Sequence, residues 1–204
     1  ALEAASVLKA GAIITDVGSV KSKVLEMIEP SLPKGVHFVG GHPIAGTEQK
    51  GVGGAFSGLF QGKRCILTPS ANTDKEALKK VKSLWESAGM EVISMDAVTH
   101  DRIMSWVSHL PQIVAYALVN SIKNGEDILS FAGSGFKDTT RIAMSDPEMW
   151  RDICLQNRDA IVNAVSAFQQ TLEALTNLIR AQDADALMKE FGHAKTQRGR
   201  LKGN

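Results

Sequence analysis

The chain has 204 residues, 44% of them hydrophobic, and its 23 Lys and Arg balance 22 Asp and Glu. This balance excludes a large excess of positive charge, which would attract nucleic acid or an anionic membrane. Its two cysteines lack a metal-type spacing, no apolar run approaches the roughly 20 residues that span a bilayer, and no targeting segment is indicated. We expect a reduced, cytoplasmic protein with one large or two small domains.

The first half of the chain alternates strand and helix patterns. Residues 1–10 resemble the end of a helix that Gly11 stops, and residues 12–17 follow as a short buried strand. The other segments predicted in this half are helices at 20–29 and 75–88 and strands at 37–39, 64–67 and 91–95. This order indicates an α/β layer with a mostly parallel sheet.

Helical periodicities replace the strands after Asp96. The first of these helices carries apolar residues between Ile103 and Ile122 on one face and polar residues between Ser105 and Tyr116 on another. Pro111 is expected to bend it. Further helices are predicted at 147–179 and 184–191, before a basic tail. We expect an α/β domain over 1–95 and an all-α domain over 96–204, an arrangement common among dehydrogenases.

The sequence DVGSVK places Gly18 and Ser19 where a strand end leads into a helix. Ligands of doubly wound folds lie at this carboxyl edge of the sheet, and a serine near a helix N-terminus can receive polar or anionic groups. The alternative is that Ser19 only caps the helix, because serine is a favoured N-cap.

The sequence GGHPIAGTE follows the next predicted strand. Gly40 and Gly41 would let the backbone approach a ligand closely, and His42 would stand at the strand end with a pKa suited to proton transfer. The alternative is an ordinary surface histidine in a loop.

Two further segments carry polar candidates. Ser108 and Gln112 lie four residues apart with His109 beside them, although polar residues opposite an apolar stripe are usually a solvated face. Arg141 can bind a carboxylate with two parallel hydrogen bonds. The alternative is that Arg141 forms only a salt bridge at the surface. The Asp146-Pro147 pair is typical of a helix cap followed by a first-turn proline.

Other kinds of site find no support. The five histidines never fall in a spacing that would preorganise a metal site, so no metal is expected. A nucleophile elbow and a Walker loop are both absent, which excludes the common hydrolase and NTPase classes.

Taken in order, DVGSVK, GGHPIAGTE, SHLP and GFKDTTRIAMSDPEMWRDI resemble the signature segments of the prephenate/arogenate dehydrogenase family. The resemblance extends to the closing FGHAKTQRGRL. It implies the C-terminal part of a Rossmann-type domain followed by a helical dimerisation domain. It also implies oxidative decarboxylation of prephenate to 4-hydroxyphenylpyruvate in tyrosine biosynthesis, with NAD as hydride acceptor and NADP not excluded.

The resemblance also implies residue roles. His42 would take the hydroxyl proton, and Ser19 would hydrogen-bond His42 and the hydroxyl while lying, with Gly18, against the nicotinamide. Arg141 would bind the side-chain carboxylate, and Ser108 would position the ring. Thr47 and Glu48 are similar to residues that reach toward a neighbouring subunit's site, and Asp138 and Trp150 to a gate of the helical domain. A homodimer is implied, with tyrosine as a candidate feedback ligand.

The chain departs from the family's pattern in three places. Gln112, at a position that the resemblance expects to contact substrate, stands where many prephenate-using members have histidine, so prephenate and arogenate both stay open as substrates. Gln49-Lys50-Gly51 replaces a more usual Lys-Ser-Gly. The Gly-x-Gly-x-x-Gly of a first βα unit is absent, which predicts that this polypeptide binds dinucleotide weakly and turns over little.

Two alternative functions stay open, one from the same class of enzyme and one from a different class of protein. A 3-hydroxyacid dehydrogenase or an imine reductase would carry a catalytic lysine in the helical domain, where Lys137 is the candidate. A non-catalytic tyrosine-binding or dimerisation module would have discarded the cofactor half.

Overall fold

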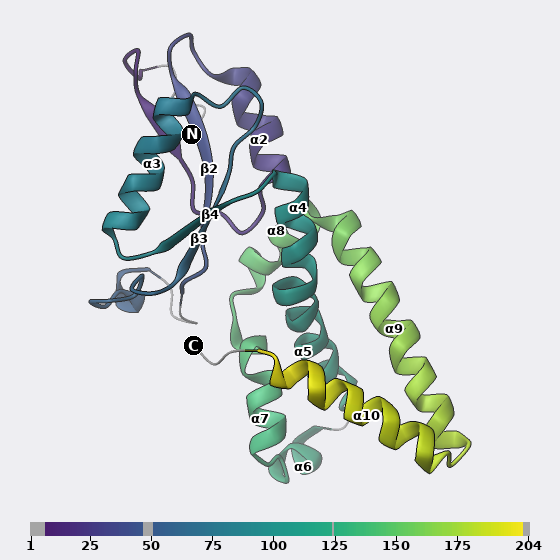
Figure 1. Ribbon diagram of the computed structural model, residues 1–204. Coiled ribbons are helices and arrows are strands. Elements are labelled where there is room, and N and C mark those ends of the chain that lie inside the picture. Colours follow the sequence, from purple (N-terminus) through teal and green to yellow (C-terminus); the bar gives the residue numbers. More distant parts are fainter. Residues whose placement is uncertain (1–6, 47–50, 124, 202–204) are drawn as a thin grey trace. The chain divides into compact units, whose positions relative to one another are not determined.

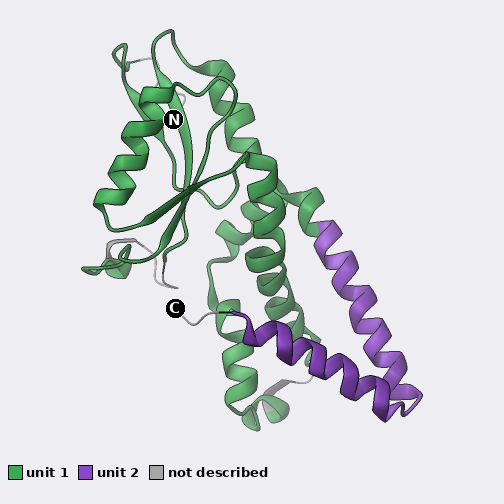
Figure 2. Ribbon diagram, in the orientation of Figure 1, with its two compact units in different colours: residues 1–161 green, residues 162–204 purple. Residues whose placement is uncertain are grey.

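The computed structural model describes residues 7–46, 51–123 and 125–201. The chain divides into two compact units, residues 1–161 and 162–204 (Figure 2). Strands and helices alternate up to β4, and in the described residues after β4 all regular elements are helices (Figure 1). This confirms the predicted α/β part followed by an all-α part.

The sheet has four strands in the order β1-β2-β3-β4, with bounds Ile13–Thr15, His37–Pro43, Arg64–Thr68 and Glu91–Ser94. β1 pairs with β2 in parallel, as β3 does with β4, but β2 and β3 are antiparallel. A parallel return needs a crossover, usually an α-helix. The described part of the connection from β2 to β3 holds only a 3-10 turn at Gly51–Gly54, so the sheet is mixed.

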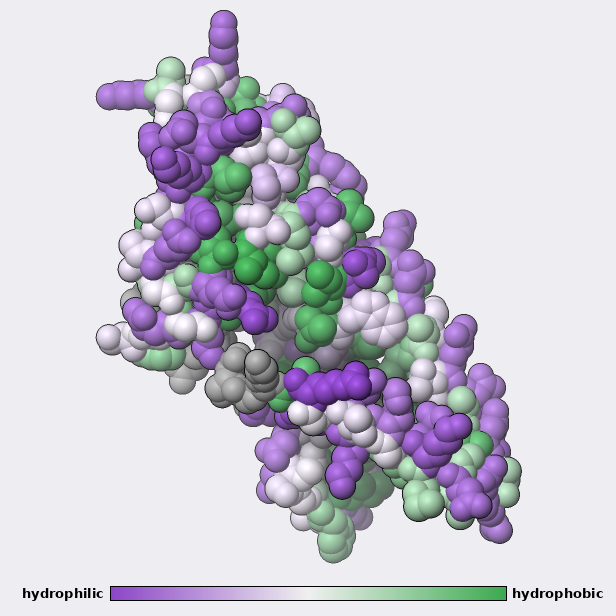
Figure 3. All heavy atoms as spheres, viewed as in Figure 1, coloured by the Kyte–Doolittle hydropathy of each residue, from purple (hydrophilic) through white to green (hydrophobic). Residues whose placement is uncertain are grey.

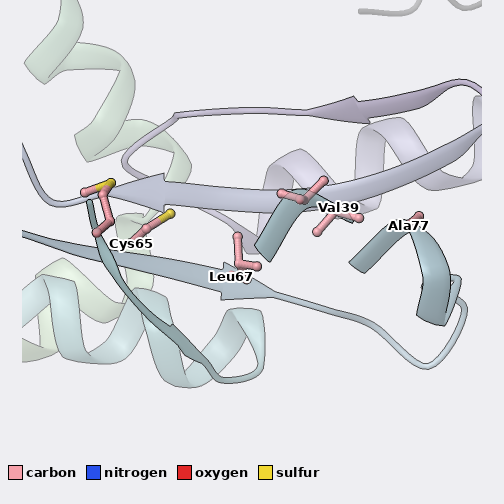
Figure 4. Packing of buried hydrophobic residues seen from close by; sticks show 6 residues of the cluster. Val39, Cys65, Leu67 and Ala77 are labelled. Atoms are coloured by element: carbon pink, nitrogen blue, oxygen red, sulfur yellow. The ribbon is translucent and has the colours of Figure 1, made fainter. Parts of the chain in front are cut away.

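The core of the sheet lies between β2, β3 and helix α3, Lys75–Ser87 (Figure 4). Val39, Cys65 and Leu67 are each 0% exposed, and Ala77 of α3 packs on them. Four of the five residues of β3 are buried, which explains why its sequence is a continuous apolar run rather than an alternating one.

The start of the chain differs from the prediction. Residues 1–6 lie outside the described residues, and 7–10 form turns rather than a helix. Gly11 has a φ of 86° and donates its backbone N–H to the carbonyl of Gly35, so the chain here is tied to a neighbouring turn. β1 is three residues long rather than six because the Asp16 carboxylate accepts from the Gly18 N–H and turns the chain.

Helix α4, Ala97–Met104, continues through a π-helical turn at Ser105–His109 into α5, Leu110–Ser121. The N–H of Leu110 donates to the carbonyl of Ser105, five residues back. Pro111 has no N–H and crowds the preceding turn, so a widened turn accommodates it. The structure thus shows a π-turn next to Pro111, and the predicted bend of the helix stays a prediction.

The remaining helices are α2 Ser22–Ile28, α6 Gly125–Ser130, α7 Ser134–Thr140, α8 Pro147–Gln156, α9 Arg158–Arg180 and α10 Ala184–Gly199. The single helix predicted over 147–179 is divided at Asn157, whose φ and ψ are −110° and 31°. The predicted tail is helical up to Gly199 because one interior glycine, Gly192, costs only about 1 kcal/mol.

The surface agrees with the balanced composition. Figure 3 shows hydrophilic side chains spread over this face and interspersed with hydrophobic ones. Within the described residues, none of the helices combines the length and apolar character needed to cross a membrane.

Candidate active site

The carboxyl ends of β1 and β2 are joined by the side chain of Asp16. The two strands pair in parallel with Thr15 opposite Val39, so Gly18 and His42 each lie three residues beyond the last pair. The Asp16 carboxylate accepts from the N–H groups of Gly41, at 2.9 Å, and of Gly18, at 3.0 Å. This holds the DVGSVK segment against the strand that carries His42.

Lys21 fixes the same junction from inside. Its side chain is 0% exposed and forms an ion pair with Asp16, and its ammonium donates to the carbonyl of Gly41 at 2.8 Å. Burial lowers the pKa of Lys21, and the charge of Asp16 opposes that shift. A buried cation left without its partner is strongly destabilising, so Asp16 and Lys21 depend on each other.

His42 contacts a second, buried histidine. Its Nδ1 lies 2.8 Å from Nε2 of His100, whose Nδ1 lies 2.9 Å from the carboxylate of Asp101. His100 is 0% exposed, whereas His42 is half-buried. Burial, with the positive charge of Lys21 adding to its effect, lowers the pKa of His42 to about 3. The imidazole of His42 is therefore uncharged at neutral pH.

Asp101 connects this pair to the start of α2. Its carboxylate accepts from the backbone N–H groups of Lys21 and Ser22, each at 2.9 Å. Burial opposes its ionisation, but hydrogen bonds from His100 and Ser22 outweigh burial and lower the pKa of Asp101. The alternative role of Ser19 as a helix cap is wrong, because α2 begins after Lys21 and Asp101 serves its N–H groups.

The polar face of α5 is buried, so the expectation of a solvated face is wrong. His109 is 0% exposed and its Nδ1 lies 3.1 Å from the side-chain nitrogen of Asn157, which also donates to the carbonyl of Asp101. Burial lowers the pKa of His109 to about 4. Trp150 packs edge-on against the His109 ring, with centroids 6.0 Å apart.

The segment that follows α7 is held by two side chains of α5. Gln112 donates to the carbonyl of Ile142 at 2.7 Å, and Tyr116 donates to that of Ser145 at 3.1 Å. Gln112 is only 2% exposed. The structure thus assigns Gln112 a contact with the backbone next to Arg141, and the predicted contact with substrate stays a prediction.

The other predicted residues fall as follows. Arg141 is exposed at the start of a 3-10 turn, Arg141–Met144, and Asp138 is exposed on α7. Ser19 and Ser108 are half-buried. Thr47 and Glu48 lie outside the described residues. Asp146 caps α8 by accepting from the Glu148 N–H at 2.9 Å, with Pro147 in the first turn, as predicted.

The interpretation of Gly40 and Gly41 as loop residues is wrong, because β2 extends through both to Pro43. A Cβ at Gly40 would lie 2.5 Å from the hydroxyl of Thr68, and one at Gly41 would lie 2.9 Å from the carbonyl of Asp16. These glycines therefore permit close packing of the protein's own strands, and the predicted close approach of a ligand stays a prediction.

Sequence reasoning missed the residues that surround His42. They are Asp16, Lys21, His100, Asp101 and Asn157. Asp16 and Lys21 could have been found from the sequence, because an acidic residue and a lysine flank Gly18 at the end of a strand. The contacts of His100 with His42, of Asp101 with Lys21 and of Asn157 with Asp101 cross 58, 80 and 56 residues of sequence, and no local pattern marks them.

A cavity of about 500 Å³ lies elsewhere in the first unit, where Leu25, Pro30 and Phe38 are among its lining residues. None of the residues predicted to bind substrate lines it. Among the described residues, no group of three His, Cys, Asp or Glu side chains could hold a metal ion.

Comparison with known proteins identifies the family. Residues 1–94 match the family model described as prephenate dehydrogenase, nucleotide-binding domain, and residues 96–193 match prephenate dehydrogenase, dimerization domain. A cyclohexadienyl dehydrogenase of Zymomonas mobilis is 36% identical over 203 residues, which cover 97% of this chain and 69% of the relative. The chain belongs to the prephenate dehydrogenase family.

Other members of the prephenate dehydrogenase family are longer. A Bacillus subtilis prephenate dehydrogenase is 39% identical over 193 residues, which cover 93% of this chain and 52% of the relative. The chain thus spans about half the length of that curated protein.

Two solved structures show the same fold. A prephenate dehydrogenase from A. aeolicus, in complex with hydroxyphenyl propionate and NAD+, is 42% identical with a TM-score of 0.90, over 97% of this chain and 70% of that one. The arogenate dehydrogenase of Synechocystis is 32% identical with a TM-score of 0.80, over 97% of this chain and 72% of that one.

Proposed function

We propose that this chain carries the proton acceptor and the substrate-holding groups of a dehydrogenase that converts prephenate oxidatively to 4-hydroxyphenylpyruvate and carbon dioxide. The observation that carries the proposal is the uncharged, half-buried imidazole of His42 at the carboxyl end of β2, where Asp16 joins that strand to Gly18. Sheets of this class bind their ligands at that edge. Family membership supports the same reaction.

The substrate proposed is a ring acid with a hydroxyl at one end and a carboxylate at the other. The related A. aeolicus structure holds hydroxyphenyl propionate, a ring with these two groups. His42 would accept the hydroxyl proton, for which a neutral imidazole is required. Arg141 would bind the side-chain carboxylate with paired hydrogen bonds. Ser19 and Ser108 would orient the hydroxyl and the ring.

The residues at the end of β1 fit the nicotinamide end of a dinucleotide. Val17 is 61% exposed there and offers an apolar surface, while Gly18 and Ser19 offer backbone and hydroxyl groups. A bound NAD(P) would supply the hydride acceptor for the ring carbon that bears the hydroxyl. We propose NAD, which the A. aeolicus relative binds, without excluding NADP.

The protein's own groups then complete the reaction. As the ring carbon loses its hydride, the O–H bond breaks and its proton passes to His42, so a carbonyl forms at that carbon. Loss of carbon dioxide from the opposite carbon leaves its bonding electrons in the ring, and the carbonyl oxygen takes a proton back from His42. The ring thereby becomes aromatic, which drives the reaction forward. Enclosure of His42 between buried groups keeps competing water from its inner edge.

Arogenate is the second candidate substrate. The Synechocystis relative is an arogenate dehydrogenase, and the Zymomonas relative acts under the broader name cyclohexadienyl dehydrogenase. Gln112 carries no charge and its amide already donates to Ile142. Gln112 therefore supplies no positive charge to bind a carboxylate of prephenate or of arogenate. Selection between these two substrates must depend on other residues.

We further propose residues 1–95 as the cofactor domain and 96–204 as the domain for substrate binding and homodimerisation. The match of 96–193 to a dimerization domain supports this division.

The remaining proposals concern individual residues, regulation and location. Thr47 and Glu48 would reach a neighbouring subunit's site, and Asp138 and Trp150 would form a gate of the helical domain. Tyrosine is the proposed feedback ligand. The cytoplasm is the proposed location, supported by two free cysteines.

The test is to fuse a complete N-terminal half of a dinucleotide-binding domain to this chain and to follow reduction of NAD and NADP. Reduction with prephenate supports the proposal, and reduction with arogenate alone supports the second candidate. Activity with 3-hydroxy acids and neither cyclohexadienyl compound would overturn both. Tyrosine binding by calorimetry with no reduction at all would instead indicate a non-catalytic module.

A further inference from the structure

We propose that His100 and Asp101 fix the tautomer of His42, so that Nδ1 of His42 carries the hydrogen and Nε2 is the bare acceptor. His100 and Asp101 are then positioning residues that select which edge of His42 takes the substrate's proton. This inference deepens the proposed function and rests on it for its catalytic consequence. The tautomer itself can be observed without any activity.

The assignment starts from Asp101, because an ionised carboxylate only accepts hydrogen bonds. Its oxygens receive the backbone N–H groups of Lys21 and Ser22 and lie 2.9 Å from Nδ1 of His100. Those hydrogen bonds also lower the pKa of Asp101. Nδ1 of His100 must therefore carry a hydrogen.

The next step follows from the ring of His100. A neutral imidazole has one N–H and one bare nitrogen, so Nε2 of His100 is bare when Nδ1 is protonated. Nε2 lies 2.8 Å from Nδ1 of His42. Two bare nitrogens at that distance would repel each other, so Nδ1 of His42 donates. Its Nε2, on the far edge of the ring, is left as the acceptor.

The reverse arrangement would need a cationic His100. That cation would be 0% exposed and would share the Asp16, Lys21 and Asp101 cluster with the buried ammonium of Lys21. The two buried cations, His100 and Lys21, would then be balanced by the two carboxylates, Asp16 and Asp101. No further negative charge would be present to stabilise the cation that forms when His42 gains a proton. With a neutral His100, the charge of Asp101 can stabilise the cation that forms when His42 is protonated.

The consequence for the reaction is a path for charge. When Nε2 of His42 takes the hydroxyl proton, the Nδ1 hydrogen already points at Nε2 of His100 and can pass to it. The N–H bond at Nδ1 then breaks, a new N–H bond forms on His100, and the positive charge comes to lie beside Asp101. In hydrolases with a buried Asp behind a histidine, loss of the correct tautomer costs about 10⁴-fold in kcat.

The positions of His100 and Asp101 are themselves secured. Asn157, at the break between α8 and α9, donates to the carbonyl of Asp101 at 2.8 Å. The cap that Asp101 provides for α2 ties α4 to the DVGSVK segment. Such outer hydrogen bonds hold a catalytic histidine in one orientation.

The test is nitrogen NMR of the chain labelled with ¹⁵N-histidine at pH 7, with resonances assigned by single replacements of each histidine. We expect the His42 signals of the Nδ1–H tautomer, which a free imidazole in water disfavours. In His100→Phe we expect His42 to revert to the Nε2–H form. His100→Gln, whose amide can accept from His42 and donate to Asp101, should keep the Nδ1–H form. His193→Gln, an exposed change, should leave the His42 signals as they are.

A His42 ring with its hydrogen on Nε2 in the parent chain overturns the inference, as does an unchanged tautomer in His100→Phe. Should His100→Phe fail to fold, the parent and His100→Gln still decide. In the fused enzyme we expect His100→Phe to lower kcat by about 10²-fold with little change in KM, and His100→Gln to restore most of it. If the tautomer is as expected but the fused enzyme reduces neither cofactor, the proposed function fails and the tautomer assignment stands.

Discussion

The Asp101 carboxylate accepts a hydrogen bond from the backbone N–H of Lys21, at 2.9 Å and across 80 residues of sequence. Lys21 belongs to the segment after β1 and Asp101 to the first helix of the all-α part. The candidate site is therefore assembled from both parts of the chain. A run of hydrogen bonds behind it leads from Asp16 through Lys21, Asp101 and His100 to His42.

Replacement of His42 tests proton acceptance. In the fused enzyme, His42→Asn should lower kcat by about 10²- to 10⁴-fold, since general base catalysis is worth that much, and should change KM far less. Steady-state kinetics with the better of the two cyclohexadienyl substrates measures both. A mutant that keeps its kcat and loses only KM would show that His42 binds rather than accepts a proton.

Replacement of Arg141 tests carboxylate binding. Arg141→Ala should raise KM by about 10- to 100-fold and leave kcat nearly unchanged, because a hydrogen bond to a charged group contributes about 1.5–3 kcal/mol. Lys137→Ala, which removes an exposed cation of α7 four residues before Arg141, is the matched comparison. Loss of kcat in Lys137→Ala, with Arg141→Ala unaffected, would favour an enzyme that uses a catalytic lysine.

Gln112 is expected to position the segment that carries Arg141. Gln112→Leu removes the donor to the Ile142 carbonyl and should cost about 1 kcal/mol, so amide exchange over 141–145 should become faster. Tyr116→Phe, which removes the donor to Ser145, should act on the same segment. Unchanged exchange in both variants would mean that α5 does not hold this turn.

The buried histidines predict a pH dependence of stability. Burial lowers the pKa of His109 to about 4 from 6.5, so below pH 6.5 the unfolded chain binds a proton that the folded chain does not. The free energy of unfolding should therefore fall as the pH falls from 6.5 to about 4, by up to about 1.4 kcal/mol per pH unit for that proton.

Urea unfolding at several pH values measures this slope. His109→Gln should flatten it, while His193→Gln, at an exposed position of α10, should not. Equal slopes in the parent and His109→Gln would show that His109 is protonated in the folded state as well.

Replacement of a glycine by alanine should have opposite effects on stability at two positions, because one glycine is closely packed at a strand end and the other is not. Gly41→Ala places a Cβ 2.9 Å from the Asp16 carbonyl and should destabilise the chain by about 1–3 kcal/mol. Gly192→Ala, where nothing lies within 4 Å inside α10, should stabilise it by about 0.5–1 kcal/mol. Thermal unfolding compares the two, and a neutral Gly41→Ala would show that the strands can move apart.

Sequence by itself determined the class and order of the elements. The apolar runs of β3 and β4, the amphipathic pattern of α3 and the helical periods after Asp96 are local, and local patterns report the period of the backbone directly. The same holds for the Asp146-Pro147 cap. The four sequence segments likewise sufficed to indicate the family, because each is a contiguous run.

Tertiary structure alone decided the surroundings of His42. The extension of β2 through Gly40 and Gly41, the buried polar face of α5 and the break at Asn157 all depend on partners far away in the chain. Burial is what gives those contacts their effect, since it both demands a partner for each polar group and moves the pKa of the histidines. A hydrogen bond from Asn157 to Asp101 spans 56 residues, and no pattern within a single helix encodes it.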